Sequence, residues 1–402
     1  MIHEFGSPDR VLVNAKEHST VVMLDPRRVF VFDRAGRLLY ASKDGALLRR
    51  GMDGRMLRIA GPAGEDAEDE EEAYRLVAMS CAEAPPEARA RLDEILRCDA
   101  PTRERDARRF RELYGSVPVL PPDQYDSIYL QLAVGCATNR CTFCTLYRDR
   151  AFRVRSPEEF GAHLADVAAL LGADLPRRRS VFLGDANAAG LPMRVLRPAL
   201  EGIRRAFPGL PLSVFADATL RRAKSPDQLR ELRGLGLGRV TFGLETALPA
   251  LYDTLRKPGT LASLLAAVRA AKEARIAVGI TVLVGLGGGE FADDHLYETE
   301  RFLRKCGLGP GDFVYLSPIR VAPDSEYASW TRADPARTMS PAAVREQMTA
   351  FRERLAPVDR SHAGPVGPFQ RWSNGAGLPG LAAVSRGEGV RVVPYDLSRF
   401  IY

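Results

Sequence analysis

The stretch SIYLQLAVGCATNRCTFC, residues 127–144, joins a buried strand pattern to three crowded cysteines. Residues 127–135 form a mostly apolar run, which is typical of a strand covered on both faces. Cys136, Cys141 and Cys144 follow this run with the spacing C-x4-C-x2-C. We therefore expect the cysteines at the carboxyl end of the strand, where parallel α/β folds place their active sites.

The same strand pattern recurs along the chain. Further apolar runs lie at residues 180–185, 210–217, 238–245, 277–288 and 312–318, and helix signals separate them. Serine–proline pairs at 156–157 and 225–226 are typical of helix starts. About six strand–helix units between residues 125 and 320 predict an α/β fold with a parallel sheet. Periodicity alone fits either an open doubly wound sheet or a partial barrel.

The sequence patterns on either side of this region are different. Residues 19–60 predict a β-meander, and an acidic run at 65–72 and helical pattern to about residue 114 follow. A proline-rich joint at 117–123 suggests a boundary, and a helix is expected from Ser340 to about residue 355. The predicted domains are an N-terminal accessory region at 1–118, a β/α region at 119–322 and a C-terminal helix and tail at 323–402. We expect both flanking regions to cover the active site.

Composition sets broad limits on function. The 402 residues are 46% hydrophobic and 27% charged, with a net charge of +6, which suits a globular protein with a solvated basic surface or an anionic partner. The first residues show no signal-peptide pattern, and no apolar run approaches the roughly 20 residues of a membrane span. We expect a cytoplasmic protein with reduced cysteines, in which clustered thiols indicate metal or redox chemistry.

The number of clustered cysteines separates two kinds of metal site. Structural zinc usually has four protein ligands, and no second cysteine pair is present, because Cys81, Cys98 and Cys306 are isolated. A [4Fe–4S] cluster held by three cysteines leaves one iron open to a substrate or cofactor. A zinc site and chance clustering remain as alternatives.

At these residues the chain resembles the radical S-adenosylmethionine (SAM) superfamily, over about residues 125–320. The commonest motif there is C-x3-C-x2-C, so we expect residues 137–140 to form a slightly wider loop around the same cluster. The resemblance implies a TIM-like partial (β/α)6 barrel that binds a [4Fe–4S] cluster and SAM. Reductive cleavage of SAM would give a 5′-deoxyadenosyl radical that abstracts hydrogen from the substrate. The electron would come from a donor such as flavodoxin or ferredoxin.

The resemblance also assigns positions to SAM. Phe143 would pack beside the adenine, Glu245 would bind the ribose hydroxyls, and Lys257 would pair with the methionine carboxylate. The backbone of Gly184 and Asp185 would receive the methionine amino group. The strand end containing Val284, Gly285 and Leu286 would read the adenine. Taken singly, Gly184 and Asp185 could form any strand-to-helix turn, and Glu245 could be a surface charge or a helix cap. Lys257 could be a solvated side chain, and residues 285–288 could be a nucleotide loop.

The substrate is less constrained by sequence. Candidate contacts lie at strand ends and in the tail: Asp217, Tyr315, Ser317, Arg320, Arg371 and Asn374. Tyr147 and Arg153 are candidates for positioning the cysteine loop, and His295 is expected on a helix surface. One hypothesis is a small, anionic metabolite or natural-product precursor; another is tRNA. A zinc-stabilised, non-enzymatic binding protein is the alternative of a different class. No cobalamin signature or second cysteine cluster is present.

Overall fold

The computed structural model describes residues 2–5, 11–25, 27–61, 68–218, 223–355 and 389–402. The chain forms two compact units. The first comprises Met1–Val119, His163–Arg179 and Ser398–Tyr402, and the second comprises Leu120–Ala162 and Ser180–Leu397. Of the described residues beyond 322, those at 323–355 and 389–397 belong to the same unit as the β/α region, whereas the sequence analysis treated 323–402 as a separate part. Among the described residues, no helix has both the length and the apolar composition needed to cross a membrane.

The first unit contains an antiparallel sheet of seven strands that follow one another in chain order. The strands are β1 Ile2–Phe5, β2 Val11–Ala15, β3 Ser19–Asp25, β4 Arg28–Asp33, β5 Leu38–Lys43, β6 Ala46–Arg50 and β7 Met56–Ala60. The predicted meander is therefore present, and β1 and β2 extend it toward the N-terminus. Asp44 and Gly45 join β5 to β6 with φ of 47° and 81°, which suits a tight hairpin turn.

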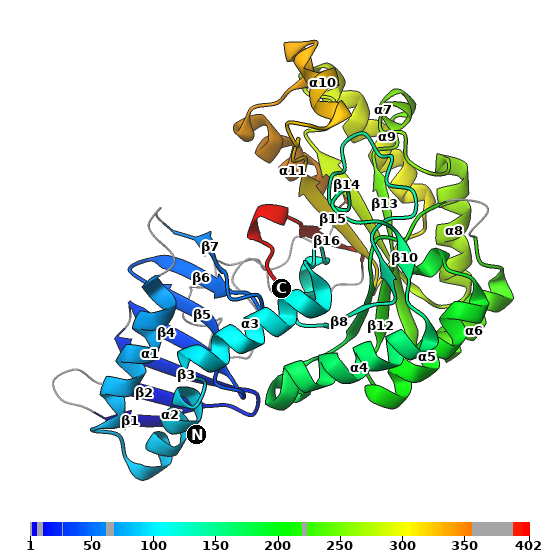
Figure 1. Ribbon diagram of the computed structural model, residues 1–402. Helices are drawn as coiled ribbons and strands as arrows, with labels where there is room; N and C mark the ends of the chain where they lie inside the picture. The colour runs from blue at the N-terminus through cyan, green and yellow to red at the C-terminus, as the bar shows by residue number, and fades with distance from the viewer. Residues whose placement is uncertain (1, 6–10, 26, 62–67, 219–222, 356–388) are drawn as a thin grey trace. The chain divides into compact units, whose positions relative to one another are not determined.

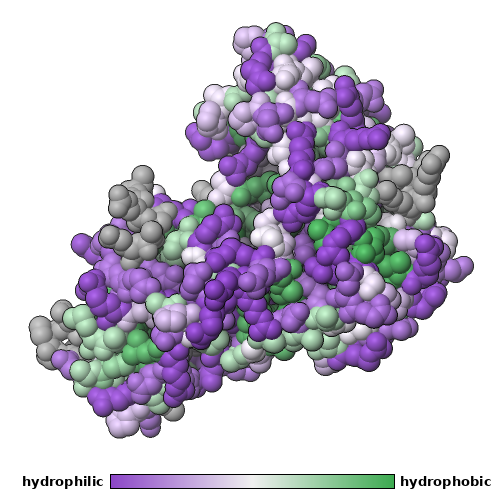
Figure 2. Space-filling view, viewed as in Figure 1, coloured by the Kyte–Doolittle hydropathy of each residue, from purple (hydrophilic) through white to green (hydrophobic). Residues whose placement is uncertain are grey.

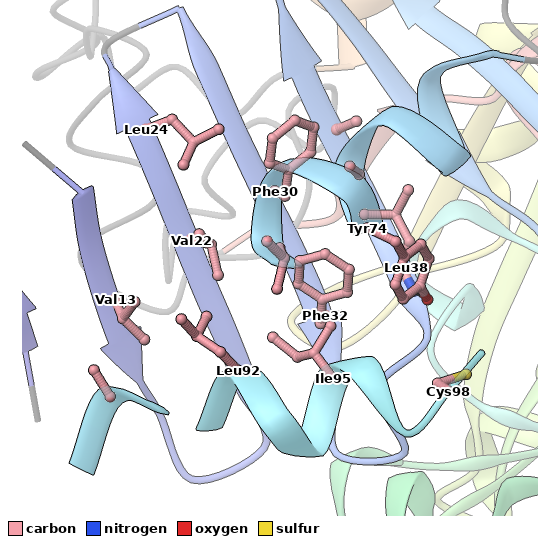
Figure 3. Packing of buried hydrophobic residues seen from close by; sticks show 14 of the residues in the cluster. Val13, Val22, Leu24, Phe30, Phe32, Leu38, Tyr74, Leu92, Ile95 and Cys98 are labelled. Atoms are coloured by element: carbon pink, nitrogen blue, oxygen red, sulfur yellow. The ribbon is translucent and has the colours of Figure 1, made fainter. Parts of the chain in front are cut away.

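Helices α1 (Glu68–Cys81) and α2 (Pro86–Leu96) cover one face of this sheet, and α3 (Ala100–Tyr114) follows them (Figure 1). Buried residues alternate along β3, as expected for a strand with one covered face. In Figure 3, Val22 and Phe32 from the strands lie near Leu92 and Ile95 of α2, in one cluster of buried residues that also contains Phe30. This apolar layer gives the first unit its own core.

The second unit contains a parallel sheet of seven strands in the order β16-β15-β14-β13-β12-β11-β8. The strands are β8 Ile128–Gln131, β11 Val181–Gly184, β12 Leu212–Ala216, β13 Leu237–Glu245, β14 Ala277–Val284, β15 Phe313–Pro318 and β16 Arg391–Pro394. Each strand lies beside the one before it, whereas a doubly wound sheet reverses its order at a switch point. The winding is therefore that of a partial TIM-like barrel.

Helices lie along the outside of the parallel sheet (Figure 1). They include α5 Met193–Ala206, α6 Pro226–Gly234, α8 Leu261–Glu273 and α9 Ala292–Lys305. The other helices of this part of the chain are α4 Pro157–Leu171, α7 Pro249–Thr254, α10 Glu326–Arg332 and α11 Pro341–Leu355. Ser225 caps α6 as its sequence predicted, because its side chain accepts a hydrogen bond from the Gln228 backbone N–H. The visible surface of the protein is mainly hydrophilic (Figure 2).

Strand β16 was not predicted and adds a seventh strand to the expected six. It pairs in parallel with β15, and the Tyr395 backbone N–H extends the ladder to the Leu316 carbonyl at 2.7 Å. The short segment RVVP carries little periodic signal, and a partner strand is needed to define it. Residues 356–388, which include most of the predicted covering tail, lie outside the described residues.

Candidate active site at the carboxyl ends of the parallel strands

The cysteine loop begins after the short strand β9 (Ala133–Val134). All three of its cysteines are free thiols of intermediate burial. Asn139 adopts a positive φ of 45°, and its backbone N–H donates to Cys136 Sγ at 3.3 Å. Its side-chain Nδ2 donates to the Tyr147 carbonyl at 3.0 Å. Asparagine tolerates this left-handed conformation, so Asn139 accommodates a turn within the long C-x4-C spacing.

Asp185 anchors the start of this loop. Its buried carboxylate accepts hydrogen bonds from the Gly135 backbone N–H at 2.7 Å, from Gln131 Nε2 at 3.1 Å and from the Tyr129 hydroxyl. Burial raises the pKa of Asp185, and the bonds from Tyr129 and Gly135 oppose that rise. The sequence assigned only the backbone of Gly184 and Asp185 to a ligand. The anchoring role of the Asp185 side chain becomes visible only in the fold.

Thr142, between the second and third cysteines, ties the loop to two helices. Its backbone N–H donates to the Leu255 carbonyl at 3.1 Å, and its hydroxyl donates to the Thr254 carbonyl at 3.0 Å, both at the end of α7. The Tyr327 backbone N–H of α10 donates to the Thr142 carbonyl at 3.1 Å. These bonds fix the loop against segments more than a hundred residues later in the chain.

Phe143 lies against an apolar cluster that contains Leu251, Leu255 and Leu286. Phe143 is only partly buried there, whereas Leu286 is fully buried. The structure thus brings together two of the positions that the sequence assigned to the adenine. A flat apolar ring can pack against such a surface.

Glu245 and Lys257 form a buried ion pair beside the cysteines. Lys257 Nζ lies 2.7 Å from Glu245 Oε1, and the side chains are 11% and 10% exposed. A Cβ at Gly243 would lie only 2.3 Å from Glu245 Oε1, so a larger residue there would displace the ends of the ion-paired side chains. Burial alone would lower the pKa of Lys257, but the charges of Glu245 and Cys141 outweigh it and raise that pKa.

The charges of Lys257 and Glu245 also affect the pKa of Cys141. Burial raises the pKa of Cys141 to about 11; Lys257 opposes this, while Cys144, Glu245 and Cys136 add to it. The three thiols and the ion pair therefore share one electrostatic environment. Twelve residues separate Glu245 from Lys257 and about a hundred separate both from the cysteines. Their proximity is a product of the fold.

The end of β14 contributes Val284, Gly285 and Leu286. Gly285 has a φ of 82°, and its backbone N–H donates to Gln347 Oε1 of α11 at 2.8 Å. The Gly287 backbone N–H donates to the Tyr327 hydroxyl at 2.8 Å. Sequence reasoning missed both Gln347 and Tyr327, because nothing local to them marks a contact with this turn.

His295 is fully buried on α9, so its expected surface position was wrong. Its Nε2 lies 2.9 Å from the Leu283 carbonyl, and its Nδ1 lies 2.8 Å from the Thr246 hydroxyl. A carbonyl can only accept, so Nε2 carries the proton and Nδ1 accepts from the hydroxyl. Burial lowers the pKa of His295 to about 4, despite its bond to Leu283. A neutral imidazole thus links the strand ends after Glu245 and before Val284.

The predicted substrate residues occupy different places. Asp217 follows β12, and its backbone N–H donates to Asn187 Oδ1 at 3.1 Å. Ser317 is buried near the carboxyl end of β15, whereas Arg320 is exposed. Arg371 and Asn374 lie outside the described residues. Asp217 and Ser317 thus lie toward the carboxyl ends of their strands, and the substrate role of all these residues stays a prediction.

Tyr315 serves a different purpose from the predicted one. Its hydroxyl donates a hydrogen bond to Asp123 Oδ1 at 2.7 Å and accepts one from Arg239 Nη1 at 3.3 Å. Arg239 also forms an ion pair with Asp123. Arg239 lies near the amino end of β13 and Glu245 at its carboxyl end. The Tyr315 hydroxyl therefore points toward the amino-terminal end of the parallel strands. We correct its assignment from substrate contact to structural network.

Tyr395 was not predicted and lies directly after β16. Its buried hydroxyl has no hydrogen-bond partner among the described residues, and the same holds for the Thr241 hydroxyl. Tyr395 packs edge-on against Tyr315 at 5.9 Å between ring centroids, and Glu245 and Tyr147 lie within electrostatic range of its hydroxyl. A buried polar atom without a hydrogen-bond partner lowers stability by about 1–3 kcal/mol. The two hydroxyls could therefore form hydrogen bonds with a polar ligand or a water molecule inside the barrel.

The donor set fits a thiolate-bound iron–sulfur cluster. Three thiols on one loop provide soft sulfur ligands for iron. The neighbouring Lys257 can pair with a cofactor carboxylate, and Glu245 can accept hydrogen bonds from cofactor hydroxyl groups. In the part of the chain that the structure describes, no three His, Cys, Asp or Glu side chains are gathered closely enough to hold a metal ion. The thiol sulfurs would therefore approach one another further when a cluster binds, and the expected loop around a cluster stays a prediction.

A scan of protein-family models matched residues 130–303 to the Radical SAM superfamily. A search of curated proteins found no match. Similar solved structures include coproporphyrinogen III oxidase (HemN) from Escherichia coli, with 15% identity and a TM-score of 0.42 over 61% of this chain and 56% of that chain.

Two further structures are similar at comparable levels. The radical S-adenosylmethionine methyltransferase TsrM from Kitasatospora setae has 17% identity and a TM-score of 0.35, over 49% of this chain and 37% of that chain. Methylornithine synthase (PylB) has 15% identity and a TM-score of 0.38, over 72% and 85%. This chain therefore spans little more than half of the oxidase and less than half of the methyltransferase. Residues 130–303 therefore form a radical SAM domain, and the cofactors of that superfamily are a [4Fe–4S] cluster and SAM.

Proposed function

We propose that this chain is a radical SAM enzyme that acts on a small, anionic metabolite or natural-product precursor. When bound, the cluster and SAM supply a 5′-deoxyadenosyl radical for hydrogen abstraction from the substrate. The observation that carries the proposal is the buried Glu245–Lys257 pair, which shares an electrostatic environment with Cys141. A buried pair of this kind matches a ligand that has both a carboxylate and hydroxyl groups.

Each predicted residue has a defined part in this proposal. Cys136, Cys141 and Cys144 hold the cluster, and Asp185 holds their loop through Gly135. Lys257 pairs with the carboxylate of SAM, and Glu245 accepts hydrogen bonds from its ribose hydroxyls. The other proposed SAM contacts are Phe143, Gly184, Val284, Gly285 and Leu286.

The barrel interior supports the exclusion of water. Tyr315 and Val314 of β15 are fully buried, and the Asp123–Arg239–Tyr315 network fills the amino-terminal end. A reactive carbon radical needs such a surrounding, because it would otherwise react with solvent or stray C–H bonds. We propose that the electron comes from a flavodoxin or ferredoxin, and that the enzyme works in the reducing cytoplasm.

The test is anaerobic reconstitution with iron and sulfide, followed by SAM and dithionite. We expect a brown protein that forms 5′-deoxyadenosine, and a loss of at least 100-fold in the Cys144→Ala variant. Cys81→Ala is the matched control, because Cys81 lies on α1 in the other unit. A colourless protein with one zinc per chain, or an active Cys144→Ala variant, would contradict the proposal. Tight tRNA binding with a steep salt dependence would contradict the small substrate.

A further inference from the structure

A pocket of about 540 Å³ lies next to the cysteine loop in the second unit. Ala137, which follows Cys136, contributes one side of it. Asn187 after β11 and Lys224 before α6 contribute the others. This volume is in the range of small-molecule sites, and the position is the carboxyl-end edge of the sheet.

The walls of this pocket are mostly apolar. Phe152, Val154, Leu191 and Met193 line it. Phe152 is 42% exposed, which is high for a phenylalanine, and its ring is therefore accessible to a ligand. Apolar side chains around a concave site favour a ligand with a hydrocarbon body, because both surfaces leave water on binding.

Lys224 is the one charged side chain among the described lining residues. Burial lowers the pKa of Lys224, while the nearby Asp217 carboxylate opposes that shift. A half-desolvated ammonium group gains more from an anionic ligand than a fully hydrated one does. Lys224 supplies one positive charge, and the nearby Asp217 carboxylate offsets part of it. A ligand with one negative charge therefore suits this pocket better than a phosphate monoester, which carries two.

The pocket wall is held by hydrogen bonds within the protein. Asn187 Oδ1 accepts from the Gly190 backbone N–H at 3.1 Å and from the Asp217 backbone N–H at 3.1 Å. One side chain therefore joins the segments that follow β11 and β12. A Cβ at Gly190 would lie only 2.6 Å from Asn187 Nδ2, so a larger residue there would displace the Asn187 side chain. This side of the pocket is therefore preorganised, which reduces the entropy lost on binding.

We propose that this pocket binds a small organic monocarboxylate, with the carboxylate on Lys224 and an apolar body against Phe152, Leu191 and Met193. That this ligand is the substrate rests on the proposed function, because the pocket adjoins the cysteine loop. Binding itself depends only on the pocket residues and needs neither the cluster nor SAM cleavage.

The experiment is calorimetric titration of the full, anaerobically reconstituted chain with 3-phenylpropionate. Its neutral counterpart, 3-phenyl-1-propanol, measures the apolar contribution alone. We expect the acid to bind at least tenfold more tightly than the alcohol to the natural protein. Lys224→Met should remove this preference, Lys224→Arg should keep it within a few-fold, and Phe152→Ala should weaken both ligands. Melting temperatures establish that each variant is folded.

Three results would overturn the pocket assignment: no binding of the acid, equal acid affinity in Lys224→Met, or tighter binding of inorganic phosphate. The Cys144→Ala variant separates this inference from the proposed function, since it should still bind 3-phenylpropionate. Acid binding without any 5′-deoxyadenosine formation by the natural protein would sink the proposed function alone. Normal SAM cleavage without acid binding would sink the pocket alone.

Discussion

The antiparallel sheet β1–β7 and the parallel sheet of the second unit each contain seven strands, but their strands are connected differently. In the antiparallel sheet, neighbouring strands are joined by short turns, so most contacts are local. In the parallel sheet, each crossover returns the chain to the same edge, and residues from distant segments meet there. Cys141, Asp185, Glu245 and Lys257 are such residues. The parallel connection is thus what permits a site to be assembled from separate short motifs.

The largest effect is expected from the ion pair beside the cysteines. Lys257→Met leaves the buried Glu245 carboxylate unpaired and removes the proposed partner of the SAM carboxylate. Breaking a buried pair costs about 3–5 kcal/mol of folding stability. Separately, because the proposed contact with the SAM carboxylate is lost, SAM cleavage should fall on the order of 100-fold, with a higher KM for SAM. Lys43→Met, which breaks the more exposed Lys43–Glu72 pair of the antiparallel unit, should leave cleavage unchanged. If Lys257→Met and Lys43→Met lose SAM cleavage to the same degree, the Glu245–Lys257 pair has no special role in SAM binding.

The next effect compares two buried carboxylates. Asp185→Ala leaves the Gly135 backbone N–H without its partner and should more than halve the iron bound per chain after reconstitution. Asp33→Ala removes the partner of the buried Arg37 in the antiparallel unit and should lower thermal stability without lowering the iron content. Asp185→Asn, which can still accept one bond, should restore part of the iron. If Asp33→Ala loses iron to the same degree, instability alone explains the result.

His295 predicts a pH dependence of stability. Its folded pKa of about 4 lies below the ordinary value of 6.5, so protonation favours the unfolded chain. This contribution is complete above pH 6.5 and is lost as the pH falls toward 4; its size is on the order of 3 kcal/mol. Urea unfolding between pH 4 and 7.5 should show a shallower decline in His295→Gln. His18→Gln, on the antiparallel unit, is the control, and a decline as steep in His295→Gln as in the natural protein would refute the assignment.

The smallest effect is local. Ser225→Ala removes the hydrogen bond from the Gln228 backbone N–H at the start of α6 and should lower stability by about 1 kcal/mol. Ser225→Thr should recover most of it. Asp99→Ala removes the corresponding cap of α3, where the Thr102 backbone N–H donates at 2.9 Å, and should affect only the antiparallel unit. Thermal unfolding with a probe in each unit distinguishes the two, and a shift of both transitions in either variant would contradict local action.

The sequence alone was sufficient for features that depend on neighbouring residues. The apolar runs of β8 and β11–β15, the Ser225 cap and the cysteine loop after the first parallel strand were all predicted, because strand patterns, caps and short loops are encoded locally. The family resemblance that joined Glu245 and Lys257 to the cysteines rested on the order of short motifs. The match of residues 130–303 confirmed the family, and the individual SAM contacts stay predictions.

Only the tertiary structure decided which side chains meet. Strand β16 exists because β15 offers it a ladder, and Tyr395 reaches the barrel interior through that pairing. His295 lies on the buried face of α9, and the partners that satisfy its two ring nitrogens, Thr246 and Leu283, come from segments that are distant in the sequence. Tyr315 was assigned to the wrong end of the barrel, because a strand position fixes the face of a side chain but not the direction of its hydroxyl. These contacts are long-range, and no local pattern in the sequence encodes them.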